Sequence, residues 1–343
     1  MATRADVAAM AGVSPAVVSY VLNGGPRPVS AEARARVLAA VEAFDYRPNA
    51  IASALRGGST RAIGLLIPST VNPYFAELAD AIEGELYTSG NLLSVGITDD
   101  AARERVHLRS LIDRRVDGII LISSRSLASV ERRRETPPIV VVDRVESADG
   151  SRTVSSVHVD NVADSAYAVE HLQGWGHRLI GCVAGPWPVP ACGERVRGWR
   201  QQQDAIGAPS GDELVAHAEF TADGGAEATY ALLGADARAI SVHDARPTAL
   251  FVSSDAQAHG VLHACAVLGL RVPEDVSIVS FDGTQSARFT NPPLTTMRQP
   301  IQSLGTTAAR LLLEAVQQPD LEPKAVVFHS NLVLGASVAA PAS

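Results

Sequence analysis

Short apolar runs alternate with longer helical patterns from residue 62 onward, and this alternation restricts the fold more than any other feature of the chain. The apolar runs at residues 63–67, 92–97 and 118–122 have the length of buried strands. Between them, residues 74–87 and 103–114 carry apolar side chains at helical spacing. Repeated strand–helix units are typical of a parallel sheet that is covered by helices on both faces.

The alternation begins a second time after strands predicted at residues 139–142 and 157–159. Two consecutive sets predict two doubly wound α/β lobes. Ligands bind at the carboxyl ends of the strands in such folds, so two facing lobes should hold a ligand in the cleft between them. The second set comprises predicted helices at residues 163–173, 194–206, 224–233 and 257–268, and predicted strands at residues 179–183, 214–218, 249–252 and 276–280.

The charge distribution separates a head from this body. The chain has 343 residues, which exceeds one typical domain, and its net charge is −8. Residues 1–61 nevertheless contain seven arginines and four acids, so the head is +3 and the remainder −11. A basic head on an acidic body is expected if only the head contacts DNA phosphates.

Cysteine use and hydropathy favour a cytoplasmic protein. The three cysteines Cys182, Cys192 and Cys265 form no CxxC motif and lie near no histidine cluster, so we expect reduced thiols and no metal site. The first residues do not resemble a secretion signal, and no apolar stretch approaches the length of a membrane span. We therefore expect no membrane partner.

The first 44 residues read as three short helices. Thr3 and Asp6 form a capping-box pattern at the start of the first helix, and Gly12 supplies the residue that ends it. Ser14 can cap a second helix, with Pro15 at its first position. Two helices joined by a turn of about three residues form a helix-turn-helix, and a third helix capped by Ser30 would brace it.

The second helix divides into a core stripe and a face available to DNA. Val18, Val21 and Leu22 recur at helical spacing and form the stripe. In this motif the start of the second helix enters the major groove, so Pro15, Ala16 and Tyr20 are candidates for base contacts and Ser19 for a phosphate contact. The alternative is that three helices simply pack together and Tyr20 is an ordinary surface aromatic. The candidate DNA-contacting residues of the head are Thr3, Ser14, Pro15, Ala16, Val17, Ser19, Tyr20 and Asn23.

These residues resemble the head of the LacI/GalR repressor family. The resemblance rests on DVA at residues 6–8, AGVS at 11–14, VSYVLN at 18–23, VS at 29–30 and YRPN at 46–49. The family usually has threonine at the position of Val17 and often arginine or histidine at that of Tyr20. Pro15 and Ala16 offer apolar contacts rather than bidentate hydrogen bonds to bases, so the operator sequence does not follow from the resemblance.

Residues 49–56 follow the head as about two turns of potential helix, which is too short to be stable in isolation. In the resembled family this segment becomes helical on operator DNA, and the pair from a dimer enters the minor groove. The resemblance therefore implies that Leu55 wedges open the central base step and that Arg56 lies near phosphates. The family commonly has arginine where this chain has Ser53. The alternative is a plain linker.

The body also resembles this family, whose core is related to periplasmic sugar-binding proteins. The resemblance implies a homodimer, a palindromic DNA operator and three chain crossings between the lobes, which we expect near Asp160, residues 284–293 and Asp320. We therefore predict a head at 1–47, a hinge at 48–61 and a core at 62–343, with one lobe at 62–159 and 292–319 and the other at 162–284 and 321–338. The motifs are NPYF at 72–75, RVDGII at 115–120, VDN at 159–161, GHRLIG at 176–181, RVRGW at 195–199, FD at 281–282 and PPLTT at 292–296.

Several cleft positions match the family's effector contacts, and their side chains suit a sugar or other polyol. Arginine and aspartate hydrogen-bond hydroxyls, and Phe220 offers an apolar wall to a ring face. Two alternatives remain: Tyr74 and Phe75 are core residues at a helix start, or Arg195 and Asp282 pair with each other across an empty cleft. The candidate effector-binding residues are Tyr74, Phe75, Asp143, Arg195, Phe220, Ser254, Asp255 and Asp282.

The sequence therefore predicts a transcriptional regulator whose DNA affinity responds to a small carbohydrate-like ligand. We find no catalytic motif of the GxSxG, HExxH or P-loop type, so we expect neither an enzyme nor a cofactor. A solute-binding protein of a transporter is the first rival, and the basic head opposes it. A cleft enzyme is the second. The chain lacks the leucine-rich terminal helix of the family's tetramers, so a dimer is expected.

Overall fold

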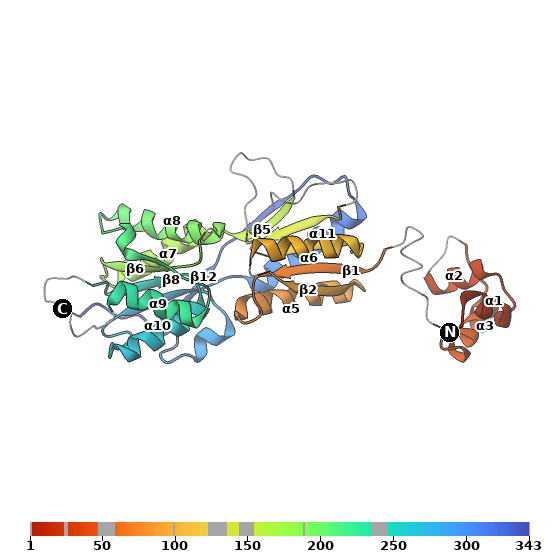
Figure 1. Cartoon of the computed structure of the whole chain (residues 1–343), viewed down its shortest axis with the longest axis horizontal. Coiled ribbons are helices and arrows are strands. Elements are labelled where there is room, and N and C mark those ends of the chain that lie inside the picture. The colour runs from red at the N-terminus through yellow and green to blue at the C-terminus, as the bar shows by residue number, and fades with distance from the viewer. Residues whose placement is uncertain are drawn as a thin grey trace. The chain divides into compact units, whose positions relative to one another are not determined.

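The computed structural model describes residues 2–23, 27–46, 59–98, 100–122, 136–143, 154–187, 189–234 and 246–342. It divides into two compact units, Met1–Thr60 and Arg61–Ser343, which are described separately below (Figure 1). Within the described ranges, no single helix combines the length and the apolar content needed to cross a membrane.

The head is a helix-turn-helix with a third helix packed against it. Thr3 and Asp6 form the expected capping box: the Asp6 amide donates to Thr3 Oγ1 at 3.3 Å, and the Thr3 amide donates to Asp6 Oδ2 at 2.7 Å. Gly12 ends the first helix in a left-handed conformation with φ +64°. Ser30 caps the third helix through the Ala33 amide. The helices are α1 (Arg4–Ala11), α2 (Pro15–Asn23) and α3 (Ala31–Ala43).

A small apolar core holds the three head helices together. Arg36 on α3 donates from Nε to the carbonyl of Ala11 at 3.0 Å, which ties α3 to the end of α1. This bond satisfies one of the carbonyls that a helix end leaves unpaired. The buried residues of this core are Val7, Ala8, Ala11, Val18, Val21, Val37 and Ala40.

The first lobe of the core, the N-lobe, is built on a six-stranded parallel sheet. Neighbouring residues of one strand face opposite sides: Ile120 packs with one cluster of buried side chains and Leu121 with another. Two helices cover one face and a third covers the other. The strands, in spatial order, are β2 (Leu92–Ile97), β1 (Ala62–Ile67), β3 (Gly118–Ile122), β4 (Ile139–Val142), β5 (Ser155–Val159) and β11 (Ala325–Phe328); the helices are α5 (Pro73–Thr88) and α11 (Ile301–Gln317) on one face and α6 (Ala101–Asp113) on the other.

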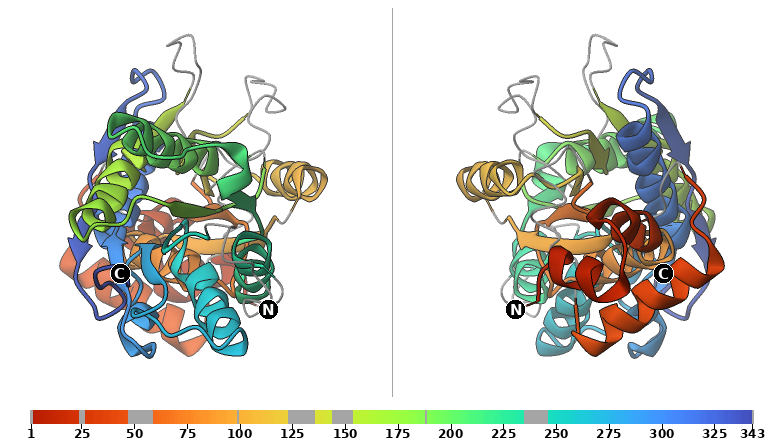
Figure 2. Two further views of the ribbon diagram at one scale, coloured as in Figure 1. Left: turned by 90° about the vertical axis from the view of Figure 1, so that its left-hand side faces the viewer. Right: turned by 90° about the vertical axis from the view of Figure 1, so that its right-hand side faces the viewer.

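The second lobe, the C-lobe, repeats this strand order with one antiparallel edge strand. Two helices cover each face of its sheet, as the green and the blue-green ribbons show in Figure 2. The strands, in spatial order, are β7 (Val215–His217), β6 (Ile180–Ala184), β8 (Ala249–Val252), β9 (Ser277–Asp282), β10 (Thr295–Arg298) and the antiparallel β12 (Asn331–Val333). The helices are α7 (Asn161–Gly174) and α8 (Pro190–Ala205) on one face and α9 (Ala222–Leu233) and α10 (Asp255–Val267) on the other, with short 3-10 turns η2 (Asp212–Leu214) and η3 (Gln285–Phe289).

The chain crosses between the lobes three times, and two crossings lie away from their predicted places. The first is at Asp160, between β5 and α7, as expected. The second is at Gln299, because β10 still pairs with β9 of the C-lobe while the following α11 packs on the N-lobe. The third is at residues 329–330, because β11 pairs with β5.

The predicted boundaries at residues 292 and 321 are therefore corrected. Strand pairing decides which lobe a segment joins: β10 keeps the chain up to residue 298 in the C-lobe, and β11 keeps it up to residue 328 in the N-lobe. Thr295–Arg298 contains a single large apolar side chain, Met297, so it lacks the apolar run of a predicted strand.

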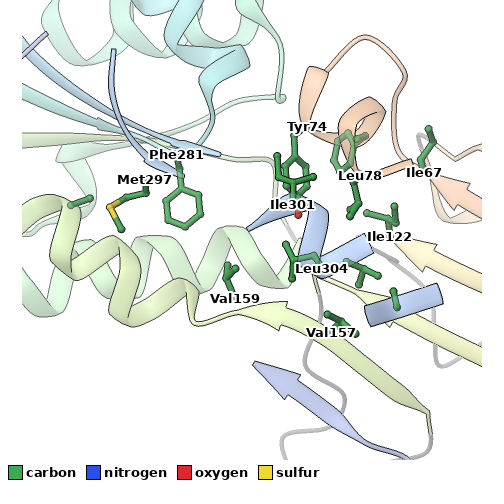
Figure 3. Close-up of a cluster of buried hydrophobic side chains, with 14 of the residues drawn as sticks. Ile67, Tyr74, Leu78, Ile122, Val157, Val159, Phe281, Met297, Ile301 and Leu304 are labelled. Atoms are coloured by element: carbon green, nitrogen blue, oxygen red, sulfur yellow. The ribbon is translucent and has the colours of Figure 1, made fainter. Parts of the chain in front are cut away.

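The apolar cores of the two lobes meet beside the crossings. In Figure 3, Phe281 and Met297 lie on the C-lobe side, and Leu78 and Ile122 lie on the N-lobe side. Tyr74 lies between the two groups. All five belong to one cluster of buried side chains, so the lobes share apolar packing at the base of the cleft.

Candidate effector site and DNA-binding face

A pocket lies between the carboxyl ends of the two sheets. Its open and enclosed space together measure about 300 Å³, but a water-sized sphere can occupy only about 20 Å³ of it, so the pocket is narrow in this structure. The predicted effector residues all line it, with the exception of Asp255, and three further residues that were not predicted also line it: Asn72, Val189 and Ala191. The lining residues are Asn72, Tyr74, Phe75, Asp143, Val189, Ala191, Arg195, Phe220, Ser254 and Asp282.

Two buried aspartates face this pocket from equivalent places in the two lobes. Asp143 follows β4, and Asp282 ends β9, which is the fourth strand of the C-lobe. Both have left-handed backbone conformations, with φ +59° and φ +109°. Such conformations cost on the order of 1–3 kcal/mol and are concentrated at functional sites. The two lobes therefore use the same backbone device to direct a carboxyl group into the cleft.

On the N-lobe side, Asp143 is held by a neutral donor. The Tyr74 hydroxyl donates to both carboxylate oxygens of Asp143, at 2.9 and 2.7 Å, and lies 3.3 Å from Gln299 Oε1. Burial raises the pKa of Asp143, while the Tyr74 hydrogen bond and the charge of Arg195 oppose that shift. Burial and the neighbouring Asp143 carboxyl raise the pKa of the Tyr74 phenol, which stays protonated and able to donate.

On the C-lobe side, Asp282 lies beside the buried guanidinium of Arg195. Arg195 Nη1 is 3.6 Å from Asp282 Oδ1, and it also donates to the Ser253 carbonyl at 2.5 Å. Its Nε donates to Asn161 Oδ1 at 2.9 Å, and its guanidinium carbon lies 3.9 Å from the centre of the Phe281 ring. Four groups thus fix this cation. The pairing of Arg195 with Asp282 occurs within the C-lobe, whereas the sequence suggested a pair across the cleft.

Asp282 is buried as deeply as its partner. Burial raises the pKa of its carboxyl well above the usual range, although Arg195 and a hydrogen bond from Gln299 act in the opposite direction. The Gln299 amide donates to Asp282 Oδ1 at 2.9 Å. The two aspartates of the cleft therefore differ in their partners, since only Asp282 has a cation within ion-pair distance among the described residues.

Helix starts direct two further polar residues to the pocket. Asn72 caps α5, with Oδ1 accepting from the Tyr74 amide at 3.0 Å, and Pro73 occupies the first helical position. Ser254 caps α10, with Oγ accepting from the Gln257 amide at 3.1 Å. Helix N-termini favour oxygen-rich ligands because their first amide groups are not paired within the helix. Asn72 could have been found in the sequence from its position as a cap two residues before Tyr74.

Asp255 does not line the pocket, so this prediction is corrected. Its carboxylate accepts from Ser280 Oγ at 2.6 Å, from Thr296 Oγ1 at 2.9 Å and from the amide and hydroxyl of Thr284 at 2.7 and 2.9 Å. Asp255 is adjacent to Ser254 but begins α10 with its side chain toward β9 and β10. Burial raises the pKa of this carboxyl against those hydrogen bonds. It cross-links two strands and a loop instead of facing a ligand.

Phe220 forms one apolar wall of the pocket, and a glycine makes its position possible. A Cβ atom on Gly185 would overlap the Phe220 ring and the sulfur of Cys192. The ring therefore packs over a backbone with no side chain, at the end of β6. Phe75 and Val189 supply apolar surface from the two helix starts.

The head presents the first residues of α2 to solvent. Ser14, Pro15 and Ala16 are exposed, and so is Thr3. Ser19 and Tyr20 are half-buried, and Val17 packs against the apolar core of the head. The hydroxyls of Thr3 and Ser14 accept from amides of their own helices, so each also has a capping role. The side chain of Asn23, together with Leu55, Arg56 and the whole predicted hinge helix, lies outside the described residues.

A helix-turn-helix unit and a two-lobed core with a polar cleft define a DNA-binding regulator that responds to a small ligand. Comparisons with known proteins agree with that class. Residues 3–49 match the bacterial regulatory proteins of the lacI family, and residues 169–338 match a periplasmic binding protein-like domain. The HTH-type transcriptional repressor PurR of Aliivibrio fischeri (strain MJ11) is 35% identical over 98% of this chain and 98% of its own length.

Solved structures give the same result. The lac repressor dimer bound to operator and the anti-inducer ONPF is 27% identical, with a TM-score of 0.84 over 99% of each chain. The transcriptional regulator CelR in its cellobiose complex is 28% identical, with a TM-score of 0.70 over 98% of this chain and 100% of that one. The chain belongs to the lacI family of bacterial regulatory proteins. It is a ligand-controlled, DNA-binding repressor and not an enzyme.

Proposed function

We propose that the effector of this repressor is a sugar or sugar derivative bound between the lobes. The observation that carries the proposal is the pair of inward-facing carboxyls, Asp143 and Asp282, with Arg195 beside one of them. Carboxylates accept hydrogen bonds from hydroxyls and a guanidinium donates to them, so the three groups suit a ligand rich in hydroxyls. Phe75 and Phe220 provide flat apolar surface for the face of a ring.

The comparisons support a sugar without identifying one, since CelR carries cellobiose in its complex. Calorimetric titration with a panel of pentoses, hexoses and disaccharides tests this proposal on the full chain. We expect one class of sugar to bind, and binding to be abolished in the Asp282→Asn variant. The matched control is Asp80→Asn, which changes an exposed carboxylate on α5. Equal affinity in Asp282→Asn and in the wild type would remove Asp282 from the effector site.

We propose that the head contacts a palindromic operator through Thr3, Ser14, Pro15, Ala16, Val17, Ser19, Tyr20 and Asn23, with Leu55 of the hinge in the minor groove and Arg56 near phosphates. The exposure of Pro15 and Ala16 at the start of α2 supports major-groove docking. Selection of sites from random DNA, at two salt concentrations with and without the sugar panel, tests it. Leu55→Ala should lower the affinity for the selected duplex and leave the affinity for sugar intact. Unchanged DNA affinity would show that Leu55 does not wedge open the central base step.

We infer that the protein acts as a homodimer in the cytoplasm, where its operator DNA is found. The lac repressor neighbour is a dimer. In this chain the edge strand β2 exposes Leu92 and Val95, whose exposed fractions are 73% and 50%. Tyr87 at the end of α5 adds a ring that is 75% exposed. Apolar edges of this kind mark association surfaces. Sedimentation of Leu92→Lys should show a shift from dimer to monomer, and a dimer of wild-type stability would place the interface elsewhere.

A further inference from the structure

Two of the three lobe crossings carry a buried side-chain amide, and each amide has polar partners at both its oxygen and its nitrogen. Asn161 begins α7 and Gln299 follows β10, and each is 2% exposed. Asn161 accepts at Oδ1 from Arg195 Nε at 2.9 Å and donates from Nδ2 to Glu194 Oε2 at 3.0 Å. Gln299 donates from Nε2 to Asp282 Oδ1 at 2.9 Å. Its Oε1 lies 3.3 Å from the Tyr74 hydroxyl and shares the single proton of that group with the nearer Asp143 oxygens.

The two amides occupy equivalent positions along the chain, each after the fifth strand of a lobe. Asn161 lies between the fifth strand of the N-lobe and a helix that packs on the C-lobe, and Gln299 lies between the fifth strand of the C-lobe and a helix that packs on the N-lobe. Each bonds to the helix that follows the first strand of a lobe: Asn161 to α8, and Gln299 to α5. Each also has a partner that lines the pocket, namely Arg195 for Asn161 and both Tyr74 and Asp282 for Gln299.

Gln299 makes the more direct link because its partners belong to different lobes. Its backbone amide donates to the Asp282 carbonyl at 3.0 Å, which fixes it to the C-lobe. Its side chain reaches Tyr74 of the N-lobe, which in turn donates to Asp143. A continuous chain of polar groups within hydrogen-bonding distance therefore runs from Asp143 through Tyr74 and Gln299 to Asp282. Rotation of one lobe against the other has to change the geometry of this chain.

We propose that Gln299 and Asn161 are positioning residues that couple the occupant of the cleft to the relative orientation of the lobes. The coupling role rests on the proposed function, since it assumes that a ligand competes for Tyr74, Asp282 or Arg195. A ligand shifts a conformational equilibrium only through contacts that differ between the two states. The crossing amides supply that difference. They bond to Arg195, Tyr74 and Asp282, which also line the pocket, so a ligand that binds these side chains weakens the bonds that hold the crossings in place.

The amide group itself is needed at Gln299. It donates to a carboxylate and accepts from a phenol at the same time, which glutamate cannot do when ionised and methionine cannot do at all. Gln299→Met retains most of the volume and removes both hydrogen bonds, and Gln299→Glu retains the acceptor alone. Gln203 on α8 is the matched control. It is 0% exposed, donates to the carbonyls of Arg178 and Pro209 at 3.0 and 2.9 Å, and lies away from the crossings.

The distance between the lobes can be measured directly by electron–electron double resonance. Spin labels are attached at Glu83→Cys on α5 and Gln201→Cys on α8, both exposed positions. The native cysteines are buried, and burial raises the pKa of the Cys265 thiol to about 12, so labelling is selective for the introduced sites. An excess of unlabelled chain prevents distances between subunits from contributing. Thermal unfolding of each variant confirms that it is folded.

We expect Gln299→Met to widen the interlobe distance distribution about twofold, Asn161→Leu to widen it less and Gln203→Met to leave it unchanged. Gln299→Glu should lie between Gln299→Met and the wild type, and it replaces Gln299→Met if that variant does not fold. Wild-type widths in both crossing variants, or equal broadening in Gln203→Met, would overturn the proposal. This measurement uses neither sugar nor DNA, so its outcome is separate from the outcome of the sugar titration.

Discussion

The two halves of the cleft share a scaffold and differ in their electrostatics. Each lobe places an aspartate with a left-handed backbone at the carboxyl end of its fourth strand, and each begins a cleft-lining helix with proline. In the N-lobe, Asp143 is bonded by the neutral Tyr74 hydroxyl, whereas in the C-lobe Asp282 lies beside the cation Arg195. The fold therefore fixes where a carboxyl group appears, and the neighbouring side chains decide its chemistry.

This difference implies unequal roles in binding. Arg195 is fixed by a carbonyl, an amide oxygen, a carboxylate and an aromatic ring, so the C-lobe half is prearranged before a ligand arrives. Hydrogen bonds with a charged partner are roughly twice as strong as neutral ones. On the N-lobe half, the Tyr74 phenol is the one side-chain donor to Asp143 among the described residues, and a ligand hydroxyl can replace that donor at little cost. We infer that the C-lobe half anchors the ligand and the N-lobe half adjusts to it.

The largest expected effect follows from removing the anchor. Arg195→Met leaves Asp282 buried without its cation, which for buried pairs costs about 3–5 kcal/mol of unfolding free energy. We also expect sugar binding to be lost. Urea unfolding and calorimetric titration measure the two effects, and Arg197→Met, an exposed arginine of the same helix, is the control. If Arg195→Met lost no more unfolding free energy and no more sugar affinity than the control, the two halves of the cleft would be less unequal than their contacts indicate.

A smaller effect is expected when the N-lobe half loses its donor. Tyr74→Phe removes the hydroxyl and leaves the Asp143 carboxyl buried without it, at a cost of about 1–3 kcal/mol. Asp143→Asn in the same chain should recover part of that loss, because a neutral amide is cheaper to leave unbonded than a carboxylate. A double-mutant cycle on unfolding free energies measures the coupling. Tyr167→Phe, at an exposed ring of α7, should have no effect. Additive losses would mean that Tyr74 and Asp143 act independently.

The sequence was sufficient for the architecture because its signals are local. Strand–helix alternation identified both lobes, and Thr3, Gly12 and Ser14 marked the helix ends of the head. Position at strand ends also brought Tyr74, Asp143 and Asp282 to one pocket, since the carboxyl ends of parallel strands meet at the same edge of a sheet.

Long-range pairing limited the rest. The crossing at residue 299 depends on β10 pairing with β9 beyond the turn η3, and the crossing at residues 329–330 depends on β11 pairing with the distant β5. No local pattern contains either choice. Asp255 was assigned to the cleft because it follows β8. The side chains of the two neighbouring residues point in different directions, so Ser254 lines the pocket and Asp255 bonds to Ser280 of β9. Gln299 and Asn161 were not predicted as functional residues, because their importance comes from partners on other elements.

The smallest expected effect is a difference in pH dependence between the two carboxyls. Burial raises the pKa of Asp143, and raises that of Asp282 further, above the unfolded value. The folded state therefore binds more protons than the unfolded state. Each carboxyl group contributes stability that is present in acid and is lost as the pH rises through the folded pKa. The charges facing Asp282 are Arg195, Asp255 and Asp143, and those facing Asp143 are Arg195 and Glu194. An asparagine at either position cannot lose a proton.

Each asparagine variant should therefore gain stability relative to the wild type as the pH rises from about 4 to about 7. The gain should be larger for Asp282→Asn than for Asp143→Asn, because the pKa of Asp282 is raised further. Urea unfolding at several pH values measures it, and Asp80→Asn corrects for the general effect of removing a surface charge. If the unfolding free energies of the two cleft variants had equal slopes against pH, Arg195 would compensate the burial of Asp282 as fully as Tyr74 compensates that of Asp143. The electrostatic difference between the lobes would then reside in ligand binding and not in the stability of the fold.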